Sequence, residues 1–173
     1  MDELIKTEEL QQFVTELNDK EYPNEAVFEH AVEALDTAKL SLLLEALPIE
    51  ERVLRWQQVP AEMKTAVLVE MRSQARKPIL SSLDDKATDQ LLQTIDAESL
   101  IELADQLSEE WVERALGYLD GKQKRWFESA NQYDSGQIGR FVDHKILTLA
   151  ANAKVKDAVR AIRRGKQNTL DHI

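Results

Sequence analysis

Residues 35–60 read LDTAKLSLLLEALPIEERVLRWQQVP, and within them an apolar residue followed by Asp or Pro occurs three times, at intervals of twelve residues. Similar junctions continue at this interval to residue 120. Their apolar members are Leu35, Leu47, Val59, Met71, Leu83, Ile95, Leu107 and Leu119. A second apolar residue precedes each of these by three positions: Val32, Leu44, Trp56, Leu68, Leu80, Leu92, Ala104 and Leu116. A period shared by eight units predicts an internal repeat.

The spacing within each unit predicts one short helix. Apolar residues three or four positions apart share one face of a helix, so each unit buries a single stripe. Asp or Ser after the apolar residue is a favourable N-cap, and Pro is favourable at the start of a helix. Helices of about nine residues, roughly 14 Å long, are marginal alone and need neighbours. We therefore expect an all-α superhelix, or solenoid, with helix breaks at or next to the junctions.

Composition limits the possible functions. The 173 residues include no Cys, which excludes disulfide scaffolds and thiolate zinc sites. The net charge is −10, and because such an acidic protein binds phosphate poorly, we expect no nucleic-acid partner. The sequence has no nucleophile-elbow motif and no glycine-rich phosphate loop, so we do not expect an enzyme. No apolar stretch approaches the ~20 residues that span a bilayer.

The most acidic part of the chain is residues 84–113, which contain ten Asp and Glu residues and a single basic residue, Lys86. Within it, Glu98 and Glu102 lie four positions apart and so share one face of the expected helix. Magnesium takes oxygen ligands and keeps several of its waters, so one or two carboxylates suit it. This pair is therefore our candidate metal site. The alternative is an ordinary solvated acidic face.

The repeat ends after Asp120, and two glycines at positions 136 and 139 indicate a boundary. We divide the chain into a helical-repeat domain, residues 1–132, and a second part, residues 133–173. In the second part, residues 145–149 are a candidate strand and residues 155–164 an amphipathic helix. Because one strand and one helix cannot form a stable fold alone, we expect this short βα fragment to open a further domain.

Two patterns along the chain occur together in a known family. The first is the run of short helices joined by Leu-Pro or Leu-Asp, as in LEALPIEER at residues 44–52. The second consists of Tyr133, Gly139, the strand at residues 146–149 and the helix ending in Ile162-Arg163-Arg164. Together they resemble MgtE-type magnesium transporters, whose cytosolic N-terminal domain is joined to a first CBS motif. Ile138 stands where that family has Ala, and Val142 where it has Met.

The resemblance implies a regulatory cytosolic domain of a magnesium, or divalent cation, transporter, at the cytoplasmic face of the membrane. In that family the N-terminal domain packs against CBS domains at high Mg²⁺ and swings away when Mg²⁺ falls. Glu98 and Glu102 align with an Asp pair that faces the CBS domains. The resemblance thus implies Mg²⁺ bound weakly and shared with CBS domains of the same transporter. It also implies a homodimer in the full-length protein, whose transmembrane part lies outside this chain.

A protein of a different class has similar repeats. FliG-type flagellar motor proteins also contain Leu-Pro-rich helical repeats, which serve as protein-interaction scaffolds without a metal role. The sequence leaves this alternative open, and a Mg²⁺ titration separates the two interpretations.

Overall fold

The computed structural model describes residues 10–17, 24–134, 136–142, 149 and 152–165, and these residues include helices and no strand. The chain divides into two compact units, Met1–Phe127 and Glu128–Ile173, and each is described by itself. The first unit begins with a helix at residues 10–17. The elements that follow are α2 (Asn24–Ala34), α3 (Thr37–Ala46), α4 (Ile49–Trp56), α5 (Ala61–Glu70), α6 (Ser73–Ser82), α7 (Asp85–Thr94), α8 (Ala97–Leu103), the 3-10 turn η1 (Ala104–Gln106), α9 (Glu109–Tyr118) and α10 (Gly121–Ala130), whose last three residues belong to the second unit.

Every predicted junction is a break between helices, so the all-α solenoid with a twelve-residue period is confirmed. The junction residues also contribute to the core. Those that are buried are Leu35, Leu47, Val59, Met71, Ile95 and Leu119. Trp56, which precedes the Val59 junction by three positions, is 2% exposed, as its place in the repeat predicts. At these junctions, a buried apolar side chain therefore holds the turn against the core.

The starts of most helices follow from the residue after each junction. Side-chain caps are present at Asp36, Asp84, Asp96 and Ser108. In each case a side-chain oxygen accepts the backbone N–H three residues later, which satisfies one of the open donors of the first turn. Pro48 and Pro60 precede α4 and α5 without a side-chain cap. Arg72 precedes α6 and likewise gives no side-chain cap. Its positive charge is in addition unfavourable at the N-terminus of a helix.

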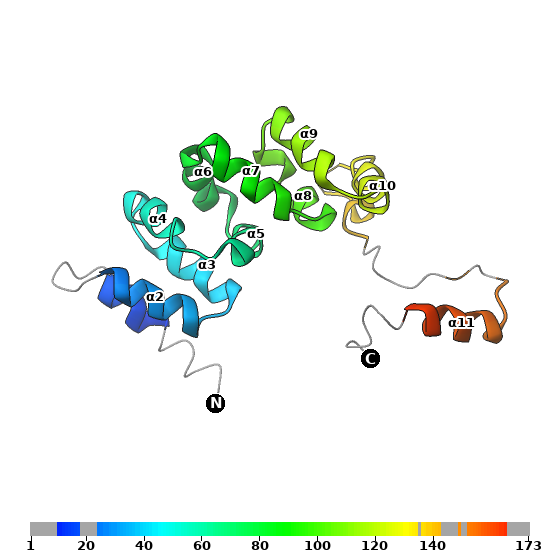
Figure 1. The fold of residues 1–173 in the computed structure, drawn as a ribbon, viewed down its shortest axis with the longest axis horizontal. Coiled ribbons are helices and arrows are strands. Elements are labelled where there is room, and N and C mark those ends of the chain that lie inside the picture. Colours follow the sequence, from blue (N-terminus) through cyan, green and yellow to red (C-terminus); the bar gives the residue numbers. More distant parts are fainter. Residues whose placement is uncertain (1–9, 18–23, 135, 143–148, 150–151, 166–173) are drawn as a thin grey trace. The chain divides into compact units, whose positions relative to one another are not determined.

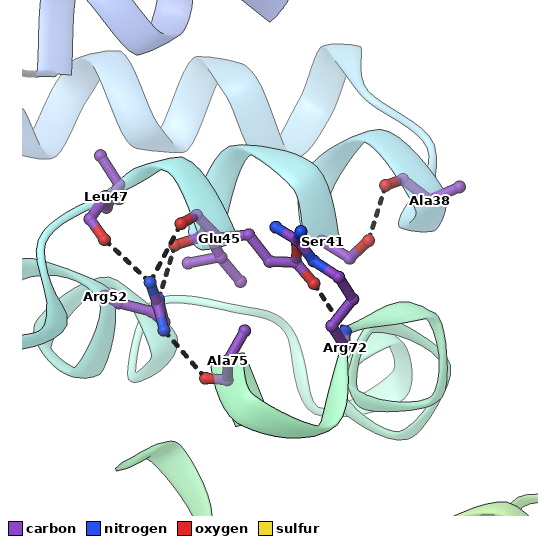
Figure 2. Close-up of polar contacts among 8 residues, drawn as sticks. Ala38, Ser41, Glu45, Leu47, Arg52, Arg72 and Ala75 are labelled. Carbon is purple, nitrogen blue, oxygen red and sulfur yellow. Dashed lines mark hydrogen bonds and ion pairs between the residues drawn. The ribbon is translucent and has the colours of Figure 1, made fainter. Parts of the chain in front are cut away.

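Glu45, near the end of α3, closes the start of α6 in place of a local cap. Its Oε1 accepts the backbone N–H of Arg72 at 2.6 Å, and its Oε2 accepts Nε of the same residue at 2.6 Å (Figure 2). The Glu45 side chain is 4% exposed, whereas that of Arg72 is 82% exposed. A buried carboxylate thus supplies the negative charge that the N-terminus of α6 lacks.

Arg52, on α4, closes the C-terminal end of α3. Its Nε donates to the carbonyl of Leu44 at 2.8 Å, and its Nη2 donates to the carbonyls of Glu45 and Leu47 at 3.0 Å. Its Nη1 donates to the carbonyl of Ala75 in α6 at 3.0 Å. One buried guanidinium therefore joins α3, α4 and α6 (Figure 2).

Helices two units apart pack against each other: α3 against α5, α4 against α6, α5 against α7 and α7 against α9. Figure 1 allows this succession to be followed from α2 in blue to α9 in green. The sequence period is twelve residues, but the packing partner is found about two periods away. The side-chain contact between Thr65 and Thr94, with 2.8 Å between their Oγ1 atoms, is one example.

In the second unit, the described residues include the 3-10 turn η2 (Ile138–Phe141) and the helix α11 (Val155–Gly165). The helix predicted at residues 155–164 is therefore confirmed. The predicted strand at residues 145–149 lies outside the described residues except for its last position, and the boundary at residue 133 stays a prediction. Gly139 lies against the ring of Tyr133, and a Cβ at this glycine would lie 2.5 Å from Cε1 of that ring. Among the described helices, none combines the length and the hydropathy of a membrane span.

Replacing Arg52 by Met should lower the free energy of unfolding by about 3 kcal/mol, because four backbone carbonyls lose the hydrogen bond that its guanidinium donates. Urea unfolding followed by far-UV circular dichroism measures this change. Lys77→Met is the control, since Lys77 is an exposed cation on α6 whose loss should cost less than about 0.5 kcal/mol. Equal stability of the two variants would contradict the structural role assigned to Arg52.

Candidate functional site

The acidic surface predicted at residues 84–113 lies on α7, α8, η1 and α9, and the contacts of its carboxylates differ. Asp84 and Asp96 cap α7 and α8, as described above. Asp89 links two helices, and Glu110 lies 3.9 Å from Arg114 within α9. Part of the acidic charge therefore stabilises the fold.

Asp89 of α7 is the centre of an interhelical network. Its Oδ1 accepts the Tyr118 hydroxyl at 2.7 Å and Nη2 of Arg114 at 2.9 Å, both from α9. Its Oδ2 accepts the side-chain amide of Gln93 at 2.9 Å. The hydrogen bond from Tyr118, followed by the one from Arg114, lowers the pKa of Asp89 below its ordinary value. Asp89 is therefore held as an ionised link between α7 and α9.

Glu98 and Glu102, the predicted metal ligands, are both exposed on α8. The helix buries its other side through Leu100, Ile101 and Leu103. Because four positions correspond to about one helical turn, the two carboxylates can lie on the same side of α8. This exposed placement matches the face expected from their spacing, and metal binding by the pair stays a prediction.

Glu102 has an ion-pair partner that sequence reasoning did not find. Nη2 of Arg76, on α6, lies 3.4 Å from Oε1 of Glu102. The Arg76 side chain is 4% exposed, and that of Glu102 is 44% exposed. Within the described residues, Nε and Nη1 of Arg76 are buried and have no hydrogen-bond partner. A buried guanidinium with one long contact is costly, because its remaining donors have lost water without gaining acceptors.

An open cavity of about 830 Å³ lies beside this ion pair. Its charged lining residues are Glu45, Arg52, Glu70, Arg72, Arg76 and Glu102. Two of them, Glu45 and Arg52, are committed to the helix-end contacts described above. Since positive and negative side chains are equal in number, the cavity has no strong preference for either sign of ligand. We therefore place the candidate site on the exposed face of α8, with Arg76 next to it.

Arg52 and Arg76 share a position in the repeat, five residues after a junction. Other units bury Leu40 and Leu100 at this position. An arginine at a core position of a repeat was the available signal in the sequence, because such a residue must find acceptors inside the protein. Arg52 finds four carbonyls, whereas Arg76 finds the single carboxylate of Glu102.

The carboxylates of α8 suit magnesium only in part. In the described part of the chain, no group of three or more His, Cys, Asp or Glu residues could hold a metal ion. Glu98 and Glu102 offer two carboxylates, which fits an ion that keeps most of its waters. By themselves they do not form a complete protein ligand set.

Comparison with known proteins gives a family and a fold. The sequence matches the family described as the MgtE intracellular N domain over residues 35–136. No curated protein matches the chain. Two solved structures are similar: the cytosolic domain of the Mg²⁺ channel MgtE in complex with ATP, with a TM-score of 0.61 and 17% identity, and the soluble part of a magnesium transporter, with a TM-score of 0.55 and 12% identity.

These two alignments cover 91% and 95% of this chain, which spans 65% and 64% of the length of the solved ones. At such identities the likeness shows the fold alone. The family match, however, extends from α3 through α10 and includes Arg76, Glu98 and Glu102. Of the two resemblances considered for the sequence, the match agrees with the MgtE-type one.

Replacing Tyr118 by Phe should raise the pKa of Asp89 toward its ordinary value, because the Tyr118 hydroxyl is the largest cause of the lowering. Carbon-13 NMR of the carboxyl group, titrated with acid, measures this pKa directly. Gln93→Ala is the control and should move the pKa less, since the Gln93 hydrogen bond is a smaller cause.

The same change has a consequence for stability. A lowered pKa in the folded state stabilises the fold above the unfolded pKa of about 3.9, and this contribution is lost as the pH falls toward the folded value. Acid unfolding should therefore be less steep in Tyr118→Phe than in the wild type. An unchanged Asp89 midpoint in Tyr118→Phe would contradict the network.

Proposed function

The chain belongs to the MgtE intracellular N domain family, and we propose that it acts as a cytosolic regulatory domain of a magnesium transporter. The family match over residues 35–136 supports this proposal, as does the fold shared with the cytosolic domain of a Mg²⁺ channel. The domain would then lie at the cytoplasmic face of the membrane that holds the transporting part. A domain of this kind regulates rather than catalyses, so we assign it no enzymatic activity.

The observation that carries the sensing mechanism is the exposure of Glu98 and Glu102 within one helix of the family-matched region. Two carboxylates that a folded helix holds one turn apart repel each other, and a divalent cation between them removes this repulsion. Mg²⁺ would bind them largely through its water shell, because it gives up its waters reluctantly. We expect weak binding by this chain alone, since the two residues supply few ligands.

The partner that completes the site is proposed to be the CBS domains of the same transporter. An acidic face that approaches another acidic face is repelled until cations bridge or screen the charges. Mg²⁺ then favours the closed arrangement by the difference in its affinity for the closed and open arrangements. High Mg²⁺ would hold the domain against the CBS domains, and low Mg²⁺ would release it. In a homodimeric transporter, each protomer would carry one such domain.

The double change Glu98→Gln and Glu102→Gln should raise the Mg²⁺ midpoint of closure by about tenfold in a longer chain that includes the CBS domains. Protection of the interdomain linker from a protease, measured over a Mg²⁺ series, reports this midpoint. The same double change in residues 1–173 should leave the melting temperature within a few degrees of the wild type, because both side chains are exposed.

A matched control is available on α9, where Glu109 and Glu113 are also exposed and four positions apart. Changing both to Gln removes the same charge from the same acidic surface. Its midpoint should move much less than that of the α8 variant. A midpoint unchanged in the α8 variant would remove Glu98 and Glu102 from the site and favour a helical scaffold without a metal role.

A further inference from the structure

The carboxylate of Glu102 already holds a cation from within the protein. Arg76 approaches it from α6 at 3.4 Å, and Arg76 is buried while Glu102 is half-exposed. We propose that the Arg76 guanidinium competes with Mg²⁺ for the Glu102 carboxylate and thereby raises the Mg²⁺ concentration at which α8 takes up the ion. This inference rests on the proposed function, because it concerns the same pair of glutamates.

The contrast with Arg52 shows that Arg76 depends on Glu102. Both arginines occupy the same position of the repeat and are buried. Arg52 donates four hydrogen bonds of 2.8 to 3.0 Å to backbone carbonyls, which cannot leave. Arg76 has one longer contact, to a side chain that can turn toward solvent, and its Nε and Nη1 have no partner in the described part of the chain. The repeat thus contains one arginine that is fixed and one whose pairing is changeable.

Mg²⁺ binding at Glu102 would disturb this pairing in either of two ways. If the carboxylate turns toward the hydrated ion, Arg76 is left as a buried cation without an acceptor, which is strongly unfavourable. If the carboxylate stays, the guanidinium and the ion repel each other across it. Both effects weaken Mg²⁺ binding compared with a glutamate pair that has no arginine next to it.

Other charged residues around the cavity do not replace Glu102 as the partner of Arg76. Glu45 is engaged by both the backbone and the side chain of Arg72. Glu70 lines the same cavity, and among the described residues the ion pair of Arg76 is with Glu102. Arg52 is a second cation at the cavity, so it adds to the repulsion that Arg76 experiences when Glu102 is withdrawn. Loss of the Glu102 carboxylate would therefore leave the charge of Arg76 uncompensated.

The test is a Mg²⁺ titration of residues 1–173 by NMR, with the amide signals of Glu98 and Glu102 as the readout and KCl used to keep the ionic strength constant. Arg76→Met should lower the dissociation constant for Mg²⁺ by about fivefold, the size expected when a partly exposed ion pair stops competing. Arg76→Lys retains the cation and should stay close to the wild-type value.

Arg76→Met should fold, because it replaces a poorly satisfied buried cation by an apolar side chain of similar length. A melting curve verifies this, and Arg76→Gln, which is neutral but polar, provides a second variant. Arg114→Met is the matched control. Arg114 forms an ion pair with Asp89, at 2.9 Å, in the same acidic region, and the change removes its positive charge. It should change the dissociation constant much less than Arg76→Met.

The outcomes separate the two proposals. If Mg²⁺ moves the α8 signals of the wild type but Arg76→Met binds no more tightly, or if Arg114→Met tightens binding equally, the competition is overturned and the glutamate site remains. If the α8 signals respond to Mg²⁺ in neither the wild type nor Arg76→Met, the competition in this chain is overturned. Linker protection in the longer chain then decides separately whether the proposed sensing mechanism also fails.

Discussion

The ends of its helices are the physical constraint on which this structure depends. A helix leaves four N–H and four carbonyl groups without partners inside it. In a chain whose helices have about ten residues, these open groups are about two fifths of all the backbone N–H and carbonyl groups of a helix. At the N-termini of several helices, an Asp or Ser that directly precedes the helix satisfies an open N–H group. Glu45 and Arg52 close a start and an end from other helices, and these longer connections bind neighbouring units together.

This division explains which features could be predicted from the sequence. A cap acts over three residues and an apolar stripe over four, so the junctions could be read from local spacing. The partner of each helix could not, because packing joins helices two units apart and no local pattern distinguishes this from contact with the next unit. The cap of α6 could not be predicted either, because the Arg72 junction has no local cap. Its carboxylate comes from Glu45, 27 positions earlier.

The candidate site was predictable to the same extent. The exposed face of α8 follows from the period of the repeat, which places Glu98 and Glu102 outside and Leu100 inside. The pairing of Glu102 with Arg76 depends on the contact of α6 with α8 and so required the structure. The charge count also overstated the acids available at residues 84–113, because Asp84 and Asp96 are used as caps and Asp89 is held by α9.

The two glutamates differ in their position along α8, and this difference affects how much each of them would gain from a nearby cation. Glu98 lies in the first turn, where the positive end of the helix dipole favours a carboxylate. Glu102 lies in the last turn, where the negative end of the helix dipole makes the same charge unfavourable. A cation next to Glu102 offsets this cost, and either the buried guanidinium of Arg76 or a hydrated Mg²⁺ ion can do so. In the structure Arg76 meets this demand, and the demand would be the physical basis for the competition that we propose.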